Sequence, residues 1–399
     1  MALVESVTHH GMGRLDDGTL VARVLPGEEV DVQAEGAVRI LTPSPQRVAA
    51  PCRHFRTCGG CAMQHASDGF VAEWKAQIVA RALAGQGLST LIRPIDTSPA
   101  QSRRRAKLSG RRTKAGATVG FHARASDMLV AVPDCQLLRP SLRALIPTLE
   151  ALTVIAASRK AEVALTVTDS RAGPDVLVET DRALTPALRI ELASFAQAHG
   201  LARLVWAGEP VVTIAPPLQR FGRADVLPPA GAFLQATAEG EAALVASVRE
   251  AVAGGGRIVD LFAGCGTFTL PLAENASVHA VEGEADMLMA LDRGWRGTSG
   301  LRAVTTEARD LFRRALLPDE LGRFDAVVID PPRAGAEAQV GMIAQSGVNR
   351  VAMVSCNPVT FARDARRLVE AGFALDWVQP VDQFRWAAHV ELVSRFTRV

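Results

Sequence analysis

Short apolar runs alternate with amphipathic stretches of helical period through the second half of the chain. Such alternation of strand and helix is typical of a doubly wound parallel sheet, an α/β fold. The runs that we interpret as parallel strands are residues 257–261, 278–281, 302–305, 324–329 and 350–355. Two further apolar runs, at residues 373–379 and 389–396, are joined by a loop instead of a helix. We therefore expect these two runs to pair antiparallel.

The first half of the chain has a different pattern. Residues 1–45 hold short runs with strand alternation, as at Val30, Val32 and Ala34, separated by glycine-containing turns. This pattern predicts a small OB-like β-barrel. Residues 97–215 mix β-type runs with helical stretches, which is typical of an α+β domain.

One helix is predicted at residues 68–85, where Ser67 or Asp68 can cap the first turn. Its apolar positions Phe70, Trp74 and Ile78 recur every four residues and share one face. We divide the chain into an N-terminal domain at 1–47, a central domain at 48–224 and a C-terminal domain at 225–399. The helix is expected to pack on the C-terminal domain.

The composition is that of an ordinary globular protein. The chain has 399 residues, too many for one core, with 48% hydrophobic and 22% charged residues. No apolar stretch reaches membrane-spanning length, and the N-terminus lacks the basic and apolar regions of a signal peptide. We expect a cytoplasmic protein without a membrane partner, and a monomer.

The charge is unevenly placed along the chain. Residues 1–224 carry a net charge of +7 and residues 225–399 a net charge of −5. Residues 101–126 hold eight basic side chains and no acidic one, which favours phosphate binding, although a solvated arginine-rich face is the alternative. The candidate phosphate-binding residues are Arg103, Arg104, Arg105, Lys107, Arg111 and Arg112.

A glycine-rich turn follows the strand at 257–261 and opens a helix. Glycines there let a ligand approach the backbone closely, and Glu282, at the end of the next strand, is placed to bind ribose hydroxyls. The turn resembles the D-x-F-x-G-x-G turn of S-adenosylmethionine-dependent methyltransferases, in which a residue at the position of Asp310 contacts adenine. The residues of the turn that carry this resemblance are Asp260, Phe262, Gly264 and Gly266.

Three polar motifs are predicted to meet at the carboxyl edge of this sheet. Cys356 lies in Ser355-Cys356-Asn357-Pro358 after one strand, and Asp330 precedes two prolines after the neighbouring strand. Glu391, in His389-Val390-Glu391, begins the last antiparallel strand and so reaches the same edge. A thiol beside a carboxylate suits nucleophilic addition, proton removal and elimination. Each motif also has a plain alternative: a buried thiol, a turn-capping aspartate, and a surface glutamate.

Four of the six cysteines form a separate group. Cys52, Cys58 and Cys61 are clustered around Gly59-Gly60, and Cys135 lies far downstream. Disulfides are rare in cytosolic proteins, so metal binding is the better interpretation. Four thiols suit either an iron–sulfur cluster or zinc, and the residue types leave both open.

Taken together, these motifs resemble the bacterial RNA uracil-5-methyltransferases of the iron–sulfur 23S rRNA type, over nearly the whole chain. Gly11-Met12-Gly13-Arg14-Leu15 and Leu25-Pro26-Gly27-Glu28 resemble a TRAM domain. Phe233-Leu234-Gln235-Ala236-Thr237 resembles the family's F-F-Q-V-N segment, with Thr237 in place of asparagine. Asp330 to Gly335 resembles the family's D-P-x-R-x-G motif.

The resemblance implies specific roles. Cys356 adds to carbon 6 of uracil, Glu391 removes the proton from carbon 5, and Asp330 hydrogen-bonds the uracil edge and lines the cofactor site. Gln235 touches S-adenosylmethionine, and the basic run contacts RNA, with 23S rRNA as the expected partner. Cys52, Cys58, Cys61 and Cys135 bind a [4Fe-4S] cluster.

Other functions remain as alternatives. A tRNA uracil-5-methyltransferase would share every motif. An RNA cytosine-5-methyltransferase would carry a second cysteine beside the proline of the D-P motif, and an amino-group methyltransferase would need neither Cys356 nor Glu391. A non-catalytic iron–sulfur RNA-binding protein would have lost that pair, which is intact here.

Overall fold

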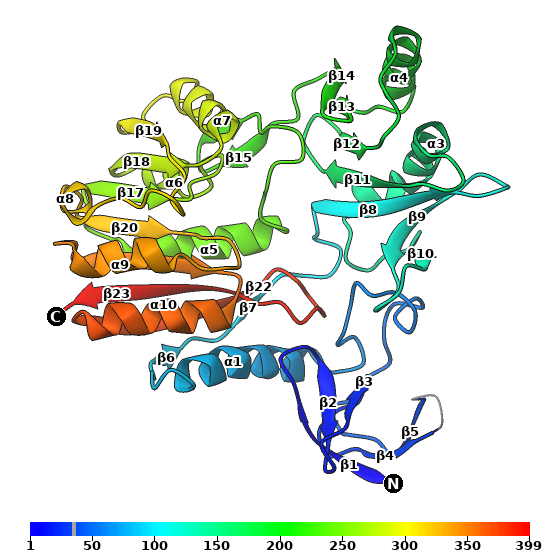
Figure 1. Ribbon diagram of the computed structural model, residues 1–399, viewed down its shortest axis with the longest axis horizontal. Coiled ribbons are helices and arrows are strands. Elements are labelled where there is room, and N and C mark those ends of the chain that lie inside the picture. Colours follow the sequence, from blue (N-terminus) through cyan, green and yellow to red (C-terminus); the bar gives the residue numbers. More distant parts are fainter. Residues whose placement is uncertain (34–36) are drawn as a thin grey trace.

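The computed structural model of the protein describes residues 1–33 and 37–399. Within these residues, three large sheets and one small hairpin follow one another along the chain (Figure 1). The N-terminal sheet has five strands, the central sheet seven and the C-terminal sheet nine. The predicted fold class, a doubly wound α/β part preceded by an α+β part and an OB-like β part, is confirmed.

The C-terminal sheet is doubly wound. Its main strands are β17 (Arg257–Leu261), β18 (Ser277–Glu282), β19 (Val304–Ala308), β20 (Ala326–Ile329), β21 (Arg350–Ser355), β22 (Phe373–Asp382) and β23 (Glu391–Arg398). They lie in the order β19-β18-β17-β20-β21-β23-β22, and β17 to β21 run parallel. Strand β23 lies antiparallel between β21 and β22, so the predicted antiparallel pair is confirmed.

Several strand boundaries differ by one to three residues from the prediction, with β20 starting at Ala326 instead of residue 324 and β23 at Glu391 instead of residue 389. Strand β19 begins at Val304 instead of residue 302, because the backbone N–H of Arg302 donates to the carbonyl of Ala273 and holds that residue in the connection. The central strand β20 is buried along its whole length, as expected for a parallel strand covered on both faces.

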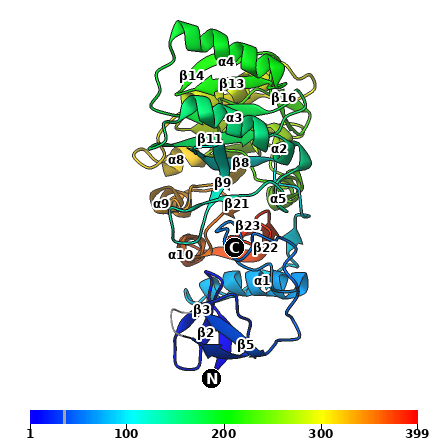
Figure 2. The ribbon, with the colours of Figure 1, turned by 90° about the vertical axis from the view of Figure 1, so that its right-hand side faces the viewer.

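Helices cover both faces of this sheet, and Figure 2 shows α5 on one side and α8, α9 and α10 on the other. The helices are α5 (Ala238–Ala251), α6 (Thr269–Leu272), α7 (Ala285–Arg296), α8 (Pro318–Leu321), α9 (Glu337–Gln345) and α10 (Pro358–Glu370). Helix α10 begins where it does because the Asn357 side chain accepts from the N–H of Val359 and Pro358 occupies the first turn. Thr237 caps α5 in the same way, through the N–H of Gly240.

The segment 68–97 belongs with the C-terminal sheet. The predicted helix is present as α1 (Asp68–Ala84), capped by Ser67, and its Val79 and Leu83 share a core with Val327 and Phe361. Strands β6 (Leu91–Ile92) and β7 (Asp96–Thr97) pair parallel with β22. Residues 91–97 therefore extend a sheet outside the central domain to which we assigned them. The domain boundaries themselves stay predictions.

The central sheet has the order β10-β9-β8-β11-β12-β13-β14. Its strands are β8 (Arg105–Arg112), β9 (Ala117–His122), β10 (Leu129–Ala131), β11 (Glu162–Thr168), β12 (Asp175–Glu179), β13 (Arg203–Trp206) and β14 (Glu209–Thr213), and its helices are α2 (Pro140–Ala144), α3 (Ile146–Ala156) and α4 (Pro186–Ala198). Strand β8 alternates as predicted, with Ala106 and Leu108 buried and Lys107 exposed. The hairpin of β15 (Gln219–Phe221) and β16 (Ala224–Val226) leads to the C-terminal sheet.

The N-terminal sheet lies beside α1, at the lower end of the molecule in Figure 1. Its strands β1 (Ala2–Val7), β2 (Met12–Leu15), β3 (Leu20–Ala22), β4 (Glu29–Val32) and β5 (Val38–Thr42) have the order β3-β2-β1-β4-β5. Wholly buried Glu28 ties the sheet to the next segment through a 2.5 Å ion pair with Arg47. Ala34, to which we extended the strand alternation, lies outside the described residues. None of the described helices is long and apolar enough to cross a membrane.

Candidate catalytic site

Three of the predicted site residues meet at the carboxyl edge of the C-terminal sheet. Asp330 follows β20 and Cys356 follows the neighbouring strand β21. Glu391 begins β23, whose antiparallel register pairs Leu392 with Ser355 and so brings the start of β23 to the end of β21. The structure therefore brings one thiol and two carboxyl groups from distant parts of the chain to a single location.

The three groups influence one another's ionisation. Burial, together with the carboxylates of Glu391 and Asp330, raises the pKa of the Cys356 thiol to about 11, against the guanidinium of Arg333. Burial also raises the pKa of Asp330 well above its usual value, with Glu391 and Asp260 adding to the effect. The thiol is protonated at neutral pH without a ligand, and a nucleophilic role requires that its proton be removed.

Glu391, unlike Asp330, has neighbours that favour its ionised form. Burial raises the pKa of Glu391 to about 7, while a hydrogen bond from Gln383 and the positive charge of Arg333 hold it down. A carboxyl group that ionises near neutral pH is suited to remove a proton, because a base works best with a pKa near the working pH.

A cavity of about 410 Å³ opens onto Cys356, a size usual for ligand pockets. Its lining joins three parts of the chain: Cys356 and His389 from the C-terminal sheet, Arg81 from α1, and His9 and Arg14 from the N-terminal sheet. Nothing in the sequence predicts that His9, Arg14 and Arg81 lie at this cavity, since they are scattered along the chain and only the packing of α1 between two sheets brings them together.

The glycine-rich turn after β17 has the backbone that its sequence requires. Gly264 and Gly266 have φ values of 55° and 94°, and a Cβ on Gly266 would lie 2.9 Å from Leu291. Phe262 adopts a φ of 64° as well, which is uncommon for a residue with a side chain. The Glu282 carboxylate accepts from the N–H of Gly264 at 3.0 Å and thereby fastens the turn to the end of β18.

Asp260, at the end of β17, has an unused hydrogen-bonding atom. It is wholly buried, and its Oδ2 accepts from the hydroxyl of Thr269 at 2.6 Å, whereas its Oδ1 has no partner. Burial raises the pKa of Asp260 to about 7, against the hydrogen bonds from Thr269. An unpartnered buried oxygen beside a glycine-rich turn fits a ligand that carries hydrogen-bond donors or positive charge.

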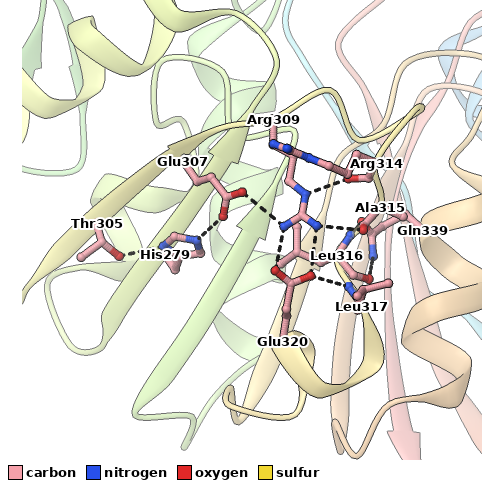
Figure 3. Close-up of polar contacts among 10 residues, drawn as sticks. All are labelled: His279, Thr305, Glu307, Arg309, Arg314, Ala315, Leu316, Leu317, Glu320 and Gln339. Carbon is pink, nitrogen blue, oxygen red and sulfur yellow. Dashed lines mark hydrogen bonds and ion pairs between the residues drawn. The ribbon is translucent and has the colours of Figure 1, made fainter.

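Asp310 lies on a loop that a buried arginine organises (Figure 3). The Arg309 guanidinium donates to both carboxylate oxygens of Glu320, at 2.9 and 3.0 Å, and to the backbone carbonyls of Arg314 and Ala315. Asp310 caps the next turn by accepting from the N–H of Phe312. The rings of Phe312 and Phe262 lie 5.4 Å apart, so this loop stands against the glycine-rich turn.

Gln235 and Thr237 lie just before α5 and are both buried. The Oε1 atom of Gln235 accepts from the side-chain nitrogen of Gln383 at 2.5 Å. Thr237 stands where the family has asparagine. Its hydroxyl accepts from the N–H of Gly240 and forms a 2.7 Å hydrogen bond with the hydroxyl of Ser98. The sequence analysis missed Gln383, because a glutamine after a strand carries no motif.

The four clustered cysteines line one cavity, together with Phe55, Phe121 and Val132. Burial raises the pKa of Cys58 and Cys135 and takes that of Cys61 to about 12, and neighbouring thiols add to each effect. Backbone N–H groups of Gly60 and Leu137 point at the sulfurs of Cys58 and Cys135, at 3.4 and 3.5 Å. No group of three or more His, Cys, Asp or Glu side chains in the described part of the chain is arranged to hold a single metal ion.

The predicted basic surface is wrong for Arg104. Strand alternation places Arg104 on the same side as Ala106 and Leu108, where it is only 6% exposed and forms an ion pair with buried Glu241. Arg103 and Arg105 also turn inward: the Arg103 guanidinium lies 5.8 Å from the ring centre of Phe384, and Arg105 donates to the carbonyl of Gly231.

The outer part of the basic run is exposed, as predicted. Lys107 and Arg111 form ion pairs with Glu179 and Glu162, at 2.7 and 2.8 Å. Arg112, at the end of β8, forms no ion pair with any described residue.

Known proteins resemble the chain along its full length. A family model described as tRNA (Uracil-5-)-methyltransferase matches residues 300–398. An RNA methyltransferase of Caulobacter vibrioides is 44% identical over 401 residues, which cover 97% of each chain. The 23S rRNA (uracil(1939)-C(5))-methyltransferase of Alkalilimnicola ehrlichii is 33% identical, with 99% of this chain and 96% of that protein covered.

A solved structure has the same fold. The Pyrococcus abyssi tRNA (uracil-54, C5)-methyltransferase in complex with S-adenosyl-L-homocysteine matches with a TM-score of 0.77 at 22% identity, over 100% of this chain and 99% of that chain. Fold, site and relatives together define an RNA methyltransferase. The chain belongs to the RNA (uracil-5-)-methyltransferase family.

Proposed function

We propose that the protein transfers a methyl group from S-adenosylmethionine to carbon 5 of a uridine in RNA. The observation that carries the proposal is the meeting of Cys356, Asp330 and Glu391 beside the glycine-rich turn, at the edge of the sheet where α/β proteins bind ligands. The preferred RNA is 23S rRNA, since a relative named for that substrate shares 33% of its residues. A tRNA is the second candidate, because the family model and the solved structure are named for tRNA.

The reaction is divided between the three residues. The Cys356 sulfur, once deprotonated, bonds to carbon 6 of uracil, and the electrons of the carbon 5–carbon 6 double bond move toward oxygen 4 as an enolate. S-adenosylmethionine would supply the electrophilic methyl group to carbon 5, with cleavage of its sulfur–methyl bond and S-adenosylhomocysteine as the leaving group. Glu391 removes the remaining proton from carbon 5, the double bond forms again, and the sulfur leaves as a thiolate. Asp330 holds the uracil edge through a hydrogen bond.

The methyl donor has a suitable set of residues. Asp260, with its unpartnered buried oxygen, offers an acceptor to a donor group of the cofactor. Glu282 offers carboxylate oxygens to ribose hydroxyls, and Asp310 and Phe312 stand where adenine is expected. The proposed cofactor-binding residues are Gln235, Asp260, Phe262, Gly264, Gly266, Glu282, Asp310 and Asp330. A target base must leave its stack to reach this site.

A [4Fe-4S] cluster held by Cys52, Cys58, Cys61 and Cys135 is the second part of the proposal. Thiols forced together in an apolar cavity need positive charge to ionise, and N–H groups aimed at sulfur are typical of cluster ligands. Gly59 fits tightly, because a Cβ there would lie 2.8 Å from the carbonyl oxygen of His122. The sulfurs of thiols that bind one zinc ion lie only about 3.8 Å from one another, by tetrahedral geometry. Sulfurs that bind separate irons of one cluster lie farther apart.

The cluster is tested by metal content. Protein purified without oxygen should be brown and hold about four irons per chain. Stoichiometric zinc, or a colourless protein that takes up no iron, would refute the proposal.

The function is tested by trapping the covalent intermediate. RNA with 5-fluorouridine at the target position should form a stable adduct with the wild-type protein, because fluorine cannot leave as a proton. Cys356→Ala should form no adduct and lose methyl transfer, yet still bind S-adenosylhomocysteine. Cys265→Ala is the matched control, since Cys265 is buried against Met287 and should leave the adduct unchanged. An adduct that persists in Cys356→Ala would overturn the assignment, and comparing methylation of 23S rRNA with that of tRNA decides the substrate.

A further inference from the structure

Gln383 is a buried glutamine at the catalytic edge that the reaction above does not use. It follows β22 directly and is 2% exposed. Both of its neighbours in the chain, Asp382 and Phe384, contact Lys75. Asp382 forms a 2.6 Å ion pair with Lys75, and both side chains are almost wholly buried. The Lys75 nitrogen also donates to the backbone carbonyl of Phe384, at 3.2 Å.

The first turn of α5 packs closely against the side chain of Gln383. Gly240, in the first turn of α5, faces it, and a Cβ on Gly240 would lie 2.7 Å from the Cβ of Gln383. The close approach of α5 to the loop after β22 therefore depends on a glycine at that position. This close approach lets Gln383 form a hydrogen bond with Gln235, which lies 148 residues away in the chain.

The hydrogen bonds of Gln383 fix which way its amide points. Its Oε1 accepts from the backbone N–H of Ala236 at 2.7 Å, and a backbone N–H can only donate. The amide nitrogen must therefore lie on the other side, where it donates to Oε1 of Gln235 at 2.5 Å. The antiparallel register pairs Val381, two residues before Gln383, with Glu391, so the start of β23 lies beside Gln383 and the two side chains interact. The amide nitrogen of Gln383 therefore lies between a proposed cofactor residue and the predicted base.

The orientation of Gln383 determines that of Gln235 in turn. Because Oε1 of Gln235 receives the hydrogen bond, its Nε2 is the atom left for other partners. Among the described residues, Nε2 of Gln235 donates to none. A bound ligand with hydrogen-bond acceptors would therefore meet the N–H groups of Gln235.

We propose that Gln383 is a positioning residue, which holds Glu391 in place for proton removal and turns the Gln235 amide so that it presents donors to the ligand. The proposal rests on the proposed function, in which Glu391 is the base. Three other groups face Glu391: Cys356 after β21, and Asp330 and Arg333 after β20. Of these, only Arg333 carries a positive charge, so Gln383 is the neutral donor that favours the ionised form of Glu391.

The test compares Gln383→Met and Gln383→Glu with Gln379→Met. Gln379 lies on β22 and is also buried, but its amide donates to the carbonyl of Pro94, away from the site. Losing a hydrogen bond to a charged group should move the pH midpoint of methyl transfer up from about 7 by about one to two pH units in Gln383→Met. Gln383→Glu keeps the acceptor for Ala236 but loses both donors, so it should move the midpoint in the same direction. Gln379→Met should lower thermal stability without moving the midpoint.

A second measurement does not depend on methyl transfer. The rate of Cys356 alkylation by iodoacetamide is measured by mass spectrometry at a series of pH values. Because the ionised Glu391 suppresses the thiolate, the plot of rate against pH should show an inflection near the pH midpoint of Glu391. Gln383→Met should shift that inflection upward. A wild-type inflection in both Gln383 variants, or an equal shift in Gln379→Met, would overturn the proposal. Failure of the uridine reaction itself would appear instead as the absence of a 5-fluorouridine adduct in the wild-type protein, with the alkylation result still deciding the role of Gln383.

Discussion

Two charged regions of this protein are built in opposite ways. Three members of the basic run around β8 are neutralised by ion pairs: Arg104 pairs with Glu241, Lys107 with Glu179 and Arg111 with Glu162. The acidic groups at the carboxyl edge of the C-terminal sheet are not neutralised in this way. Among the described residues, none of Asp260, Asp330 and Glu391 forms an ion pair. Burial raises the pKa of each carboxyl group, and Glu391 and Asp260 raise that of Asp330 further.

The difference separates charges that support the fold from charges that act on a ligand. A buried ion pair is costly to break but gives no reactivity, since each charge is already satisfied. Carboxyl groups held near one another without ion pairs keep perturbed ionisation, which is the usual state of acid–base groups in active sites. A charge-rich stretch of sequence is therefore a weaker sign of function here than three acids from distant strands.

The largest effect that would break this comparison is expected at Glu391. Glu391→Gln removes the base but leaves Cys356 able to add, so turnover should fall by about 10²- to 10⁴-fold while a covalent RNA adduct accumulates. Turnover is measured by methyl transfer to RNA and the adduct by denaturing gel. Glu370→Gln is the control, because Glu370 is an exposed residue of α10 that pairs with Arg366. Loss of activity without any adduct would show that Glu391 acts earlier than proton removal.

The wild-type reaction should also depend on pH in a defined direction. Burial raises the pKa of Glu391 to about 7, and the base must be ionised to accept a proton. The rate at which methylated RNA is released in a single turnover should therefore fall about tenfold for each pH unit below that midpoint, since only ionised Glu391 removes the carbon 5 proton. A rate that is constant between pH 5 and pH 8 would contradict the assignment of Glu391.

The next largest effect is expected on the free energy of unfolding, at the buried ion pair between Arg104 of the central domain and Glu241 of α5. Arg104→Met leaves the Glu241 carboxylate buried without its cation, which should lower the free energy of unfolding by about 3–5 kcal/mol. The double variant Arg104→Met with Glu241→Leu should recover most of that loss, because neither charge remains. Both are measured by urea denaturation. Lys107→Met, at an exposed pair, should change stability by less than about 1 kcal/mol.

The sequence predicted those parts of the molecule that follow from local periodicity. Apolar runs located β17, β18, β20 and β21, and the helix signals located α1, because each pattern is set by residues close in the chain. Parallel order then placed Asp330 beside Cys356. The prediction failed at Arg104, where period-two alternation was visible but a charged residue was taken to face solvent although its partner Glu241 lies on α5.

What the sequence could not predict depends on contacts between distant segments. His9, Arg14 and Arg81 reach the Cys356 cavity only because α1 packs between two sheets. Gln383 meets Gln235 only because Gly240 allows a close approach. Neither arrangement leaves a spacing or a motif along the chain, so one sequence alone gives no signal for it.

A smaller effect is expected at Asp260, where function opposes stability. The folded protein raises the pKa of this carboxyl to about 7, above its unfolded value, so the neutral form is favoured and stability is lost as the pH rises through 7. At pH 8, Asp260→Asn should therefore raise the free energy of unfolding of the ligand-free protein by a few kcal/mol at most, which is measured as a higher melting temperature. At pH 4 both quantities should be nearly unchanged. Binding of S-adenosylhomocysteine should weaken. Asp325→Asn is the opposite case, because backbone hydrogen bonds from Arg257 lower the pKa of Asp325, and this variant should lose stability at neutral pH.

The smallest expected effect sharpens the comparison on the basic side. If paired charges are already neutralised, they should release few counterions when RNA binds. Arg112 is exposed at the end of β8 without a partner among the described residues, whereas Arg111 pairs with Glu162 at 2.8 Å. Arg112→Gln should therefore lower the slope of log affinity for RNA against log salt by about 0.7–0.9, and Arg111→Gln by clearly less. Affinities are measured by fluorescence anisotropy at several salt concentrations, with S-adenosylhomocysteine binding as the control for folding. Equal slopes in both variants and the wild type would show that this end of β8 does not contact RNA, and that the basic run serves the central domain alone.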